Sequence, residues 1–218
     1  GISRTILFNE SIVVDYLSSF MKIITLISAF VVLLISSNYL KTFKIFKIEY
    51  PILILSSVLG MMIMISSNDL IVFYMGLELQ SLALYVLATF NRDQLKSSEA
   101  GLKYFVLSAL SSGLLLYGCS LIYGFTGSTN FNVIAIQFNT NEYALTFGIV
   151  FVLVGLAFKI SAVPFHMWAP DVYEGSPTSV TLFFTMVPKI AALTVFIRFL
   201  YVPFLNLIDQ WQMILVFL

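Results

Sequence analysis

The chain alternates between long apolar runs and short polar segments. Six of the runs approach or exceed the length that a helix needs to cross a bilayer, about 17–25 residues. They cover residues 20–40, 51–67, 70–90, 100–125, 143–161 and 178–200. A further apolar run begins at residues 212–218. The pattern predicts an all-α polytopic membrane protein with about six transmembrane helices and the start of a seventh.

Polar residues and prolines predict where several of these helices begin. Residues 1–16 are too polar to span a bilayer and predict a surface segment. Pro51 suits a first helical turn, because the N–H that proline lacks would be unpaired there in any case. Asn68 and Asp69 are good N-cap residues for the helix expected from Leu70.

Residues 162–177 (AVPFHMWAPDVYEGSP) interrupt the regular pattern. Three prolines forbid a regular helix here, yet the segment stays largely apolar. Irregular backbone at membrane depth survives only inside protein or against a hydrated cavity. We therefore expect a broken helix near Lys159, followed by a helix over residues 178–200 that kinks or holds water at Pro188.

The composition supports a membrane protein and narrows its chemistry. Hydrophobic residues make up 60% of the 218 residues and charged residues only 10%, whereas soluble domains carry about 25% charged residues. The net charge is zero, so nothing indicates a nucleic-acid partner, and membrane lipids are the expected surroundings. A single cysteine, Cys119, and a single histidine, His166, exclude an internal disulfide and a multi-histidine haem or metal site.

Four ionisable residues interrupt the apolar runs: Glu78, Lys103, Lys159 and Lys189. A charged side chain at the centre of a membrane helix costs roughly 2.5–3.5 kcal/mol on insertion scales, so such residues are functional candidates by default. Their opposite signs on different helices indicate a path for charge through the membrane.

Each of these residues also has a structural interpretation. Glu78 shares one helical face with Ser81 and Tyr85, at i, i+3 and i+7, and is either a proton carrier or electrostatic gate or a carboxyl that joins two helices. Lys159 is either a proton-binding lysine at a helix break or a lysine that reaches the membrane interface from a helix end.

The remaining candidates divide in the same way. Lys189 lies in mid-span, where reaching the interface is hardest, whereas Lys103 lies about one turn inside its helix and fits an interfacial lysine equally well. His166 either relays protons between Lys159 and the aqueous side or is packed and hydrogen-bonded. Asp171 and Glu174 are expected to be hydrated or capping loop acids.

Basic residues in the short loops predict the orientation. Two loops, at residues 41–50 and 91–99, lie an even number of crossings apart and hold five basic residues: Lys41, Lys44, Lys47, Arg92 and Lys96. The opposite side holds about three. The positive-inside rule therefore favours the two loops as the cytoplasmic or matrix side, and residues 164–177 face the same side.

Four stretches carry a resemblance to a known family. They are GLELQSLALYVLATF (76–90), SSEAGLKYFVLSALSSGLLLYGCSLIYGFTGSTNF (97–131), FKISAVPFHMWAPDVYEGSPTSV (158–180) and MVPKIAAL (186–193). They resemble subunit 2 of NADH dehydrogenase, the antiporter-like membrane subunit of respiratory complex I that is called chain N in bacteria. The resemblance covers nearly the whole chain but only about half of the full-length family pattern.

The resemblance implies a fold and a set of roles. The family builds its channels from two inverted five-helix repeats, and residues 51–200 look like the first repeat, preceded by residues 1–50 and followed by a loop and helix start at 201–218. It implies that Glu78 is the buried glutamate, Lys159 the lysine on the broken helix, Lys189 the central-axis lysine and Lys103 an additional buried lysine.

The resemblance also implies the setting. The chain would be a proton-translocating subunit of NADH:ubiquinone reductase that does no redox chemistry itself, since NADH, FMN, iron–sulfur clusters and ubiquinone bind other subunits. Its partners would be other membrane-arm subunits and whatever polypeptide or segment supplies the second repeat. The abundance of Phe (21) and Tyr (11) fits an AT-rich genome. This favours the mitochondrial inner membrane over a bacterial plasma membrane. A stand-alone cation/proton antiporter and a non-conducting structural half-subunit are the alternatives.

The ends of the chain fit this partial length. It begins at Gly1 rather than Met and stops inside an apolar run at Leu218. We therefore expect a part of a longer polypeptide, or one piece of a split one.

Overall fold

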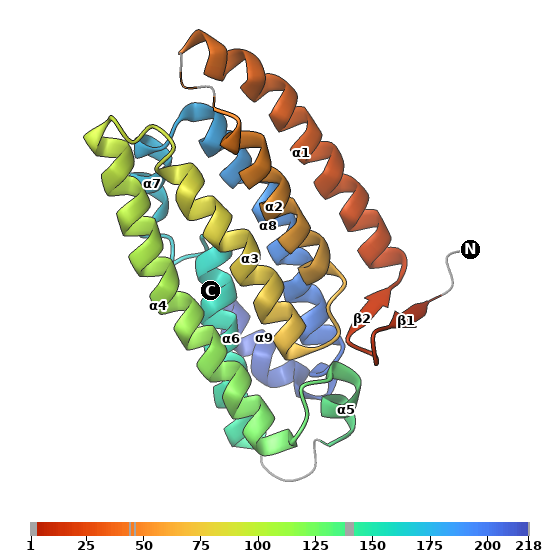
Figure 1. Cartoon of the computed structure of the whole chain (residues 1–218). Helices are drawn as coiled ribbons and strands as arrows, with labels where there is room; N and C mark the ends of the chain where they lie inside the picture. Colours follow the sequence, from red (N-terminus) through yellow and green to blue (C-terminus); the bar gives the residue numbers. More distant parts are fainter. Residues whose placement is uncertain (1–3, 44, 46, 138–141, 218) are drawn as a thin grey trace.

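The computed structural model describes residues 4–43, 45, 47–137 and 142–217, which form a bundle of roughly aligned helices with a small β-hairpin at one end (Figure 1). Lys44, Gly1 and Leu218, which entered the predictions above, lie outside the described residues. The helices are α1 (Tyr16–Thr42), α2 (Glu49–Ile65), α3 (Leu70–Ala88), α4 (Leu95–Thr126), α5 (Phe131–Ile136), α6 (Glu142–Ile160), α7 (Ala169–Gly175), α8 (Thr178–Tyr201) and α9 (Ile208–Phe217), with a 3₁₀ turn at Leu205–Leu207.

The predicted all-helical membrane class is confirmed. Within the described residues, four helices are long and apolar enough to cross a membrane: α1, α3, α4 and α8. Two predicted spans fall on the shorter apolar helices α2 and α6. A helix also begins where the sequence predicted one, at α9.

Two polar segments contain structure that the sequence did not predict. Residues 1–16, expected to be only a surface segment, contain an antiparallel hairpin of β1 (Thr5–Leu7) and β2 (Ile12–Val14). Its turn holds Phe8, Asn9 and Glu10 at positive φ without a glycine, so the usual hairpin signal is missing. The proline-rich segment 162–177 contains the short helix α7, because Pro170 falls in its first turn, where proline is tolerated.

At the hairpin end of the bundle, hydrogen bonds connect the hairpin, the α2–α3 connection and the α4–α5 connection to one another. The N–H of Val13 donates to the carbonyl of Ser66, and the N–H of Leu70 donates to the carbonyl of Thr129. The side-chain amides of Asn68 and Asn130 both donate to the carbonyl of Glu10. Three connections that are distant in the sequence therefore form one layer beneath the helices; we call it the base.

Carboxylate caps fix two helix starts at this end. The Asp69 side chain accepts from the N–H groups of Ile71 and Val72, which confirms it as the N-cap of α3. Asp15 caps α1 by accepting a hydrogen bond from the N–H of Ser18. Its two carboxylate oxygens also accept from Nη2 of Arg198, near the end of α8, at 2.8 and 2.9 Å. The first and eighth helices are thereby joined at the base.

Helices pair closely where glycines face each other. α2 packs on α3, α4 on α6 and α1 on α8. A Cβ at Gly60 of α2 would lie 2.6 Å from the backbone nitrogen of Gln80 and 2.7 Å from the carbonyl of Gly76 in α3. Small residues at such positions bring membrane helices together through van der Waals contact.

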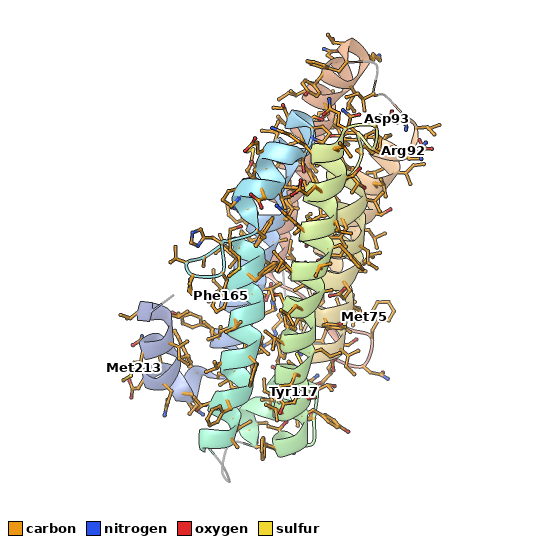
Figure 2. All side chains as sticks on the ribbon, turned by 90° about the vertical axis from the view of Figure 1, so that its left-hand side faces the viewer. Met75, Arg92, Asp93, Tyr117, Phe165 and Met213 are labelled. Carbon is orange, nitrogen blue, oxygen red and sulfur yellow. The ribbon has the colours of Figure 1, made fainter. Side chains whose placement is uncertain are left out.

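The opposite end carries the loops that the sequence placed on one side. A surface pocket is lined by residues of both the α1–α2 and α3–α4 connections, among them Lys47 and Asp93. α7 lies at the same end, against the first turns of α4. Figure 2 shows Arg92 and Asp93 at this end, remote from Tyr117 further along α4. The predicted grouping is confirmed; its cytoplasmic or matrix assignment stays a prediction.

Candidate functional site

Lys159 lies in the last turn of α6 and is buried, with 8% of its surface exposed. Its Nζ lies 2.5 Å from Oγ of Ser108, 2.9 Å from Oγ of Ser81 and 3.4 Å from the hydroxyl of Tyr85. The ammonium also lies 5.7 Å from the centre of the Tyr85 ring. Three hydroxyls and one aromatic face thus surround a buried amine; we call this group the hydroxyl cage.

Three helices contribute to the cage. Ser81 and Tyr85 stand one turn apart on α3, Ser108 comes from α4 and Lys159 from α6. The Tyr85 hydroxyl donates to Ser108 at 2.6 Å, and Ser81 donates to the carbonyl of Leu77 at 2.7 Å. A hydroxyl accepts from an ammonium while it donates onward. The cage is therefore able to hold the proton of Lys159 and to exchange it along hydroxyls.

Glu78 lies one turn before Ser81 on the same face of α3, as the sequence predicted. It is half-buried, and in the part of the chain that the structure describes its Oε1 is buried without a hydrogen-bond partner. No observed ion pair among these residues joins it to Lys159. The polar stripe that begins at Glu78 nevertheless leads to the lysine through Ser81 and Tyr85. A buried carboxylate oxygen without a donor can accept a further hydrogen bond.

The broken helix is confirmed next to Lys159. α6 ends at Ile160, and Ser161 adopts a left-handed conformation with φ of 65°. The carbonyl of Phe158, in the last turn of α6, accepts hydrogen bonds of 3.1 Å from the N–H of Ser161 and of 2.9 Å from Nε1 of Trp168. An indole N–H from the following segment therefore helps to close the break.

Lys189 is half-buried on α8, which continues through Pro188 as one helix. Its Nζ lies 5.6 Å from the centre of the Tyr173 ring on α7. This distance fits a cation–π contact. No direct contact between Lys189 and Lys159 is observed among the described residues.

Lys103 is not a buried lysine, and that expectation is wrong. Its side chain is 42% exposed and makes two ion pairs of 2.8 Å, with Glu99 in the preceding turn of α4 and with Asp171 of α7. α4 begins at Leu95, before the predicted start at residue 100, and Lys103 lies on the partly exposed face that carries Glu99 and meets Asp171 of α7. Each of the two acids on α7 pairs with a lysine of α4. Asp171 pairs with Lys103, and Glu174 pairs with Lys96 at 3.2 Å.

His166 is exposed in the connection at residues 161–168, and its backbone carbonyl accepts from the N–H of Ala169. Figure 2 shows its neighbour Phe165 on this connection, beside α6. No contact between His166 and Lys159 is observed within the described part of the chain, so the relay role stays a prediction.

No candidate metal centre is present among residues 4–43, 45, 47–137 and 142–217, where no three His, Cys, Asp or Glu side chains gather. Cys119 is a free, buried thiol on α4.

Three residues of the site were not predicted from the sequence. Ser108 was not predicted as a partner of Lys159, because α4 contains many serines and Ser108 lies 51 residues before Lys159 in the sequence. Trp168 and Tyr173 were seen only as part of an apolar, proline-rich segment. The indole N–H of Trp168 was the available signal, since a buried Trp usually finds a partner for its N–H. Tyr173 contributes its ring, which carried no such signal.

Known proteins resemble this chain in sequence and in fold. A family model described as NADH:quinone oxidoreductase/Mrp antiporter, TM matches residues 67–218. The chain is 80% identical over 212 residues to NADH-quinone oxidoreductase subunit N of Pelagibacter ubique, covering 97% of this chain and 45% of that protein. It is 58% identical over 206 residues to subunit N of Rhodospirillum rubrum, covering 93% and 42%. It thus spans less than half the length of these relatives.

Solved structures show the same similarity. A chain of respiratory complex I from Thermus thermophilus superposes with a TM-score of 0.75 at 34% identity, covering 90% of this chain and 42% of that one. A chain of the Mrp complex from Dietzia sp. superposes with a TM-score of 0.74 at 25% identity, covering 88% and 36%.

Proposed function

Because the chain belongs to the NADH:quinone oxidoreductase/Mrp antiporter transmembrane family, we propose that it acts within the membrane arm of respiratory complex I and translocates protons there. The observation that carries the proposal is the hydroxyl cage around Lys159. A buried amine held only by neutral hydroxyls, at a helix break, is suited to binding and releasing a proton. The similarity to subunit N of bacterial complex I supports this assignment.

The proposed mechanism follows the contacts. Lys159 receives a proton, and Ser81, Tyr85 and Ser108 stabilise the resulting ammonium with their oxygen atoms. Glu78 lies one turn before Ser81 in the same polar stripe and would act on the lysine through its charge. A change in the surroundings of Glu78 would then alter proton binding at Lys159 and drive release toward Lys189.

The setting is part of the proposal. We infer a bacterial plasma membrane, because the relatives named above are bacterial; they do not support the preference for a mitochondrial membrane. The partners would be other membrane-arm subunits and the polypeptide that supplies the rest of the family's length. We expect no cofactor in this chain, with NADH, FMN, iron–sulfur clusters and ubiquinone bound elsewhere in the complex.

A stand-alone cation/proton antiporter is a second candidate, because the chain also resembles a subunit of the Dietzia Mrp complex. The higher identity to subunit N favours complex I. Sodium-dependent proton exchange by the protein in vesicles without NADH oxidation would favour the antiporter instead. A non-conducting structural half-subunit would tolerate loss of the cage, so the same substitution tests it.

The decisive test is Lys159→Ala in the complete subunit, within the assembled complex in inverted membrane vesicles. The number of protons moved per NADH oxidised is measured with a pH-sensitive dye, with Lys47→Ala, a change at an exposed lysine of the α1–α2 connection, as the control. We expect a reduced proton yield for Lys159→Ala and a normal yield for the control. A normal yield for Lys159→Ala would exclude proton translocation through this site.

A further inference from the structure

The short helix α7 lies between the two candidate lysines. At its start, Trp168 is buried, donates to the carbonyl next to Lys159, and stacks on Tyr104 of α4 with ring centres 4.7 Å apart. The ring of Tyr173 makes an edge-to-face contact with the ring of Trp168, with ring centres 5.8 Å apart. The ring of Tyr173 in turn lies 5.6 Å from Nζ of Lys189.

These contacts make a continuous bridge. It runs from the carbonyl of Phe158, through Trp168 and Tyr173, to the ammonium of Lys189; we call it the aromatic bridge. The backbone carbonyl of Tyr173 also accepts from the hydroxyl of Thr181 in α8, at 3.1 Å. The position of α7 therefore determines both the closure of the α6 break and the partner of Lys189.

The position of α7 is fixed from outside the bridge, by α4. Asp171 accepts an ion pair of 2.8 Å from Lys103, and Glu174 one of 3.2 Å from Lys96. Gly175 closes the contact, because a Cβ there would lie 2.6 Å from Cβ of Ala100 and 2.7 Å from the carbonyl of Lys96. All three contacts seat α7 on the first turns of α4.

We propose that Lys103 is a positioning residue that holds α7, and with it the aromatic bridge, through its ion pair with Asp171. It carries no proton in the transfer path. This inference rests on the proposed function for the meaning of the two bridged lysines. The size of the effect follows from exposure: Lys103 and Asp171 are 42% and 56% exposed, and exposed ion pairs shift an equilibrium by at most about fivefold.

Arginine separates positioning from proton transfer at this residue. Lys103→Arg keeps a cation that pairs with a carboxylate, but an arginine in a protein does not release its proton. In assembled complex within inverted vesicles, we expect Lys103→Arg to keep the normal proton yield per NADH. Lys103→Gln should lower the yield, by no more than about fivefold. Equal losses in Lys103→Arg and Lys103→Gln would overturn the proposal.

Two further variants locate the effect on α7. Asp171→Asn breaks the contact from the α7 side and should match Lys103→Gln, with no additional loss when the two are combined. Glu99→Gln removes the other ion pair of the same lysine, which lies wholly within α4, and should leave the yield unchanged. A loss in Glu99→Gln equal to that in Asp171→Asn would contradict a role through α7.

Gly175→Ala tests the seating without changing any charge. The added methyl meets Ala100 and should lower the yield as Lys103→Gln does; a normal yield would count against the proposal. Lys159→Ala in the same vesicles keeps the two ideas apart. If Lys159→Ala pumps normally, the proposed function fails. If it does not pump while Lys103→Gln pumps normally, only the positioning role fails.

Discussion

Replacing Asp15 by Asn tests the ion pair that joins α1 to α8 at the base. The amide retains an oxygen that accepts from the N–H of Ser18, so the cap of α1 is kept. The charge opposite Arg198 is lost, and the Arg198 side chain is only 4% exposed. Asn keeps one of the two oxygens that accept from Nη2 of Arg198, so the measured effect is the loss of the negative charge and of one hydrogen bond beside a buried guanidinium.

The magnitude follows from this burial. Removing one partner of a buried ion pair costs about 3–5 kcal/mol, because the other charge stays desolvated. Asp15 is 28% exposed, which lets water reach the pair, so we expect the lower end, about 3 kcal/mol. Since 1.4 kcal/mol is about tenfold, the ratio of folded to unfolded protein should fall by roughly a hundredfold.

The buried thiol of Cys119 provides the assay. A thiol-reactive dye labels it when the detergent-solubilised protein unfolds, so labelling against denaturant concentration gives the free energy of unfolding. Lys96→Gln is the control, because its ion pair with Glu174 is 78% and 76% exposed and should contribute at most about 1 kcal/mol. Equal stability of Asp15→Asn and Lys96→Gln would refute the reasoning.

Three further outcomes are expected. Burial raises the pKa of the Asp15 carboxyl, but hydrogen bonds from Arg198 and the Ser18 N–H outweigh it and leave the pKa below its ordinary value. The wild type should therefore lose stability as the pH falls from about 4. Asp15→Asn should lose less stability over that range. Gly60→Ala should destabilise by about 1–3 kcal/mol, because its methyl meets the backbone of α3, whereas Gly113→Ala, with no atom within 4 Å of its Cβ, should be neutral or stabilising by the same thiol assay. Ser108→Ala removes the shortest contact to Lys159 and should slow proton pumping about tenfold, equivalent to about 1.4 kcal/mol; an unchanged rate would remove Ser108 from the path.

The sequence was sufficient to predict features that depend on local pattern. Apolar length predicted the helices, and the carboxylate of Asp69 predicted the start of α3. The spacing of Ser81 and Tyr85 behind Glu78 predicted one polar face, and that face does meet Lys159. Each of these inferences needs only neighbours within two turns.

Features that depend on distant partners were not predictable. The family resemblance implied a buried Lys103, but its ionic partner Asp171 lies 68 residues away in the sequence and holds the side chain at the surface. The turn at residues 8–10 has positive φ without glycine, and the side chains that hold its Glu10 carbonyl, Asn68 and Asn130, are distant in the sequence. The glycine contact between Gly60 and Gly76 likewise appears only when α2 and α3 are paired in space.

The two ends of the bundle respond differently to dissolved salt. The base is held by amide-to-carbonyl hydrogen bonds and by the shielded contact of Arg198, which ions scarcely reach. The opposite end seats α7 through carboxylates and ammonium groups that face solvent, where charges are screened over about 8 Å at physiological ionic strength. Raising the salt concentration should therefore loosen α7 while α1 and α8 stay joined, which gives an experimenter a reversible way to disturb one end of the protein alone.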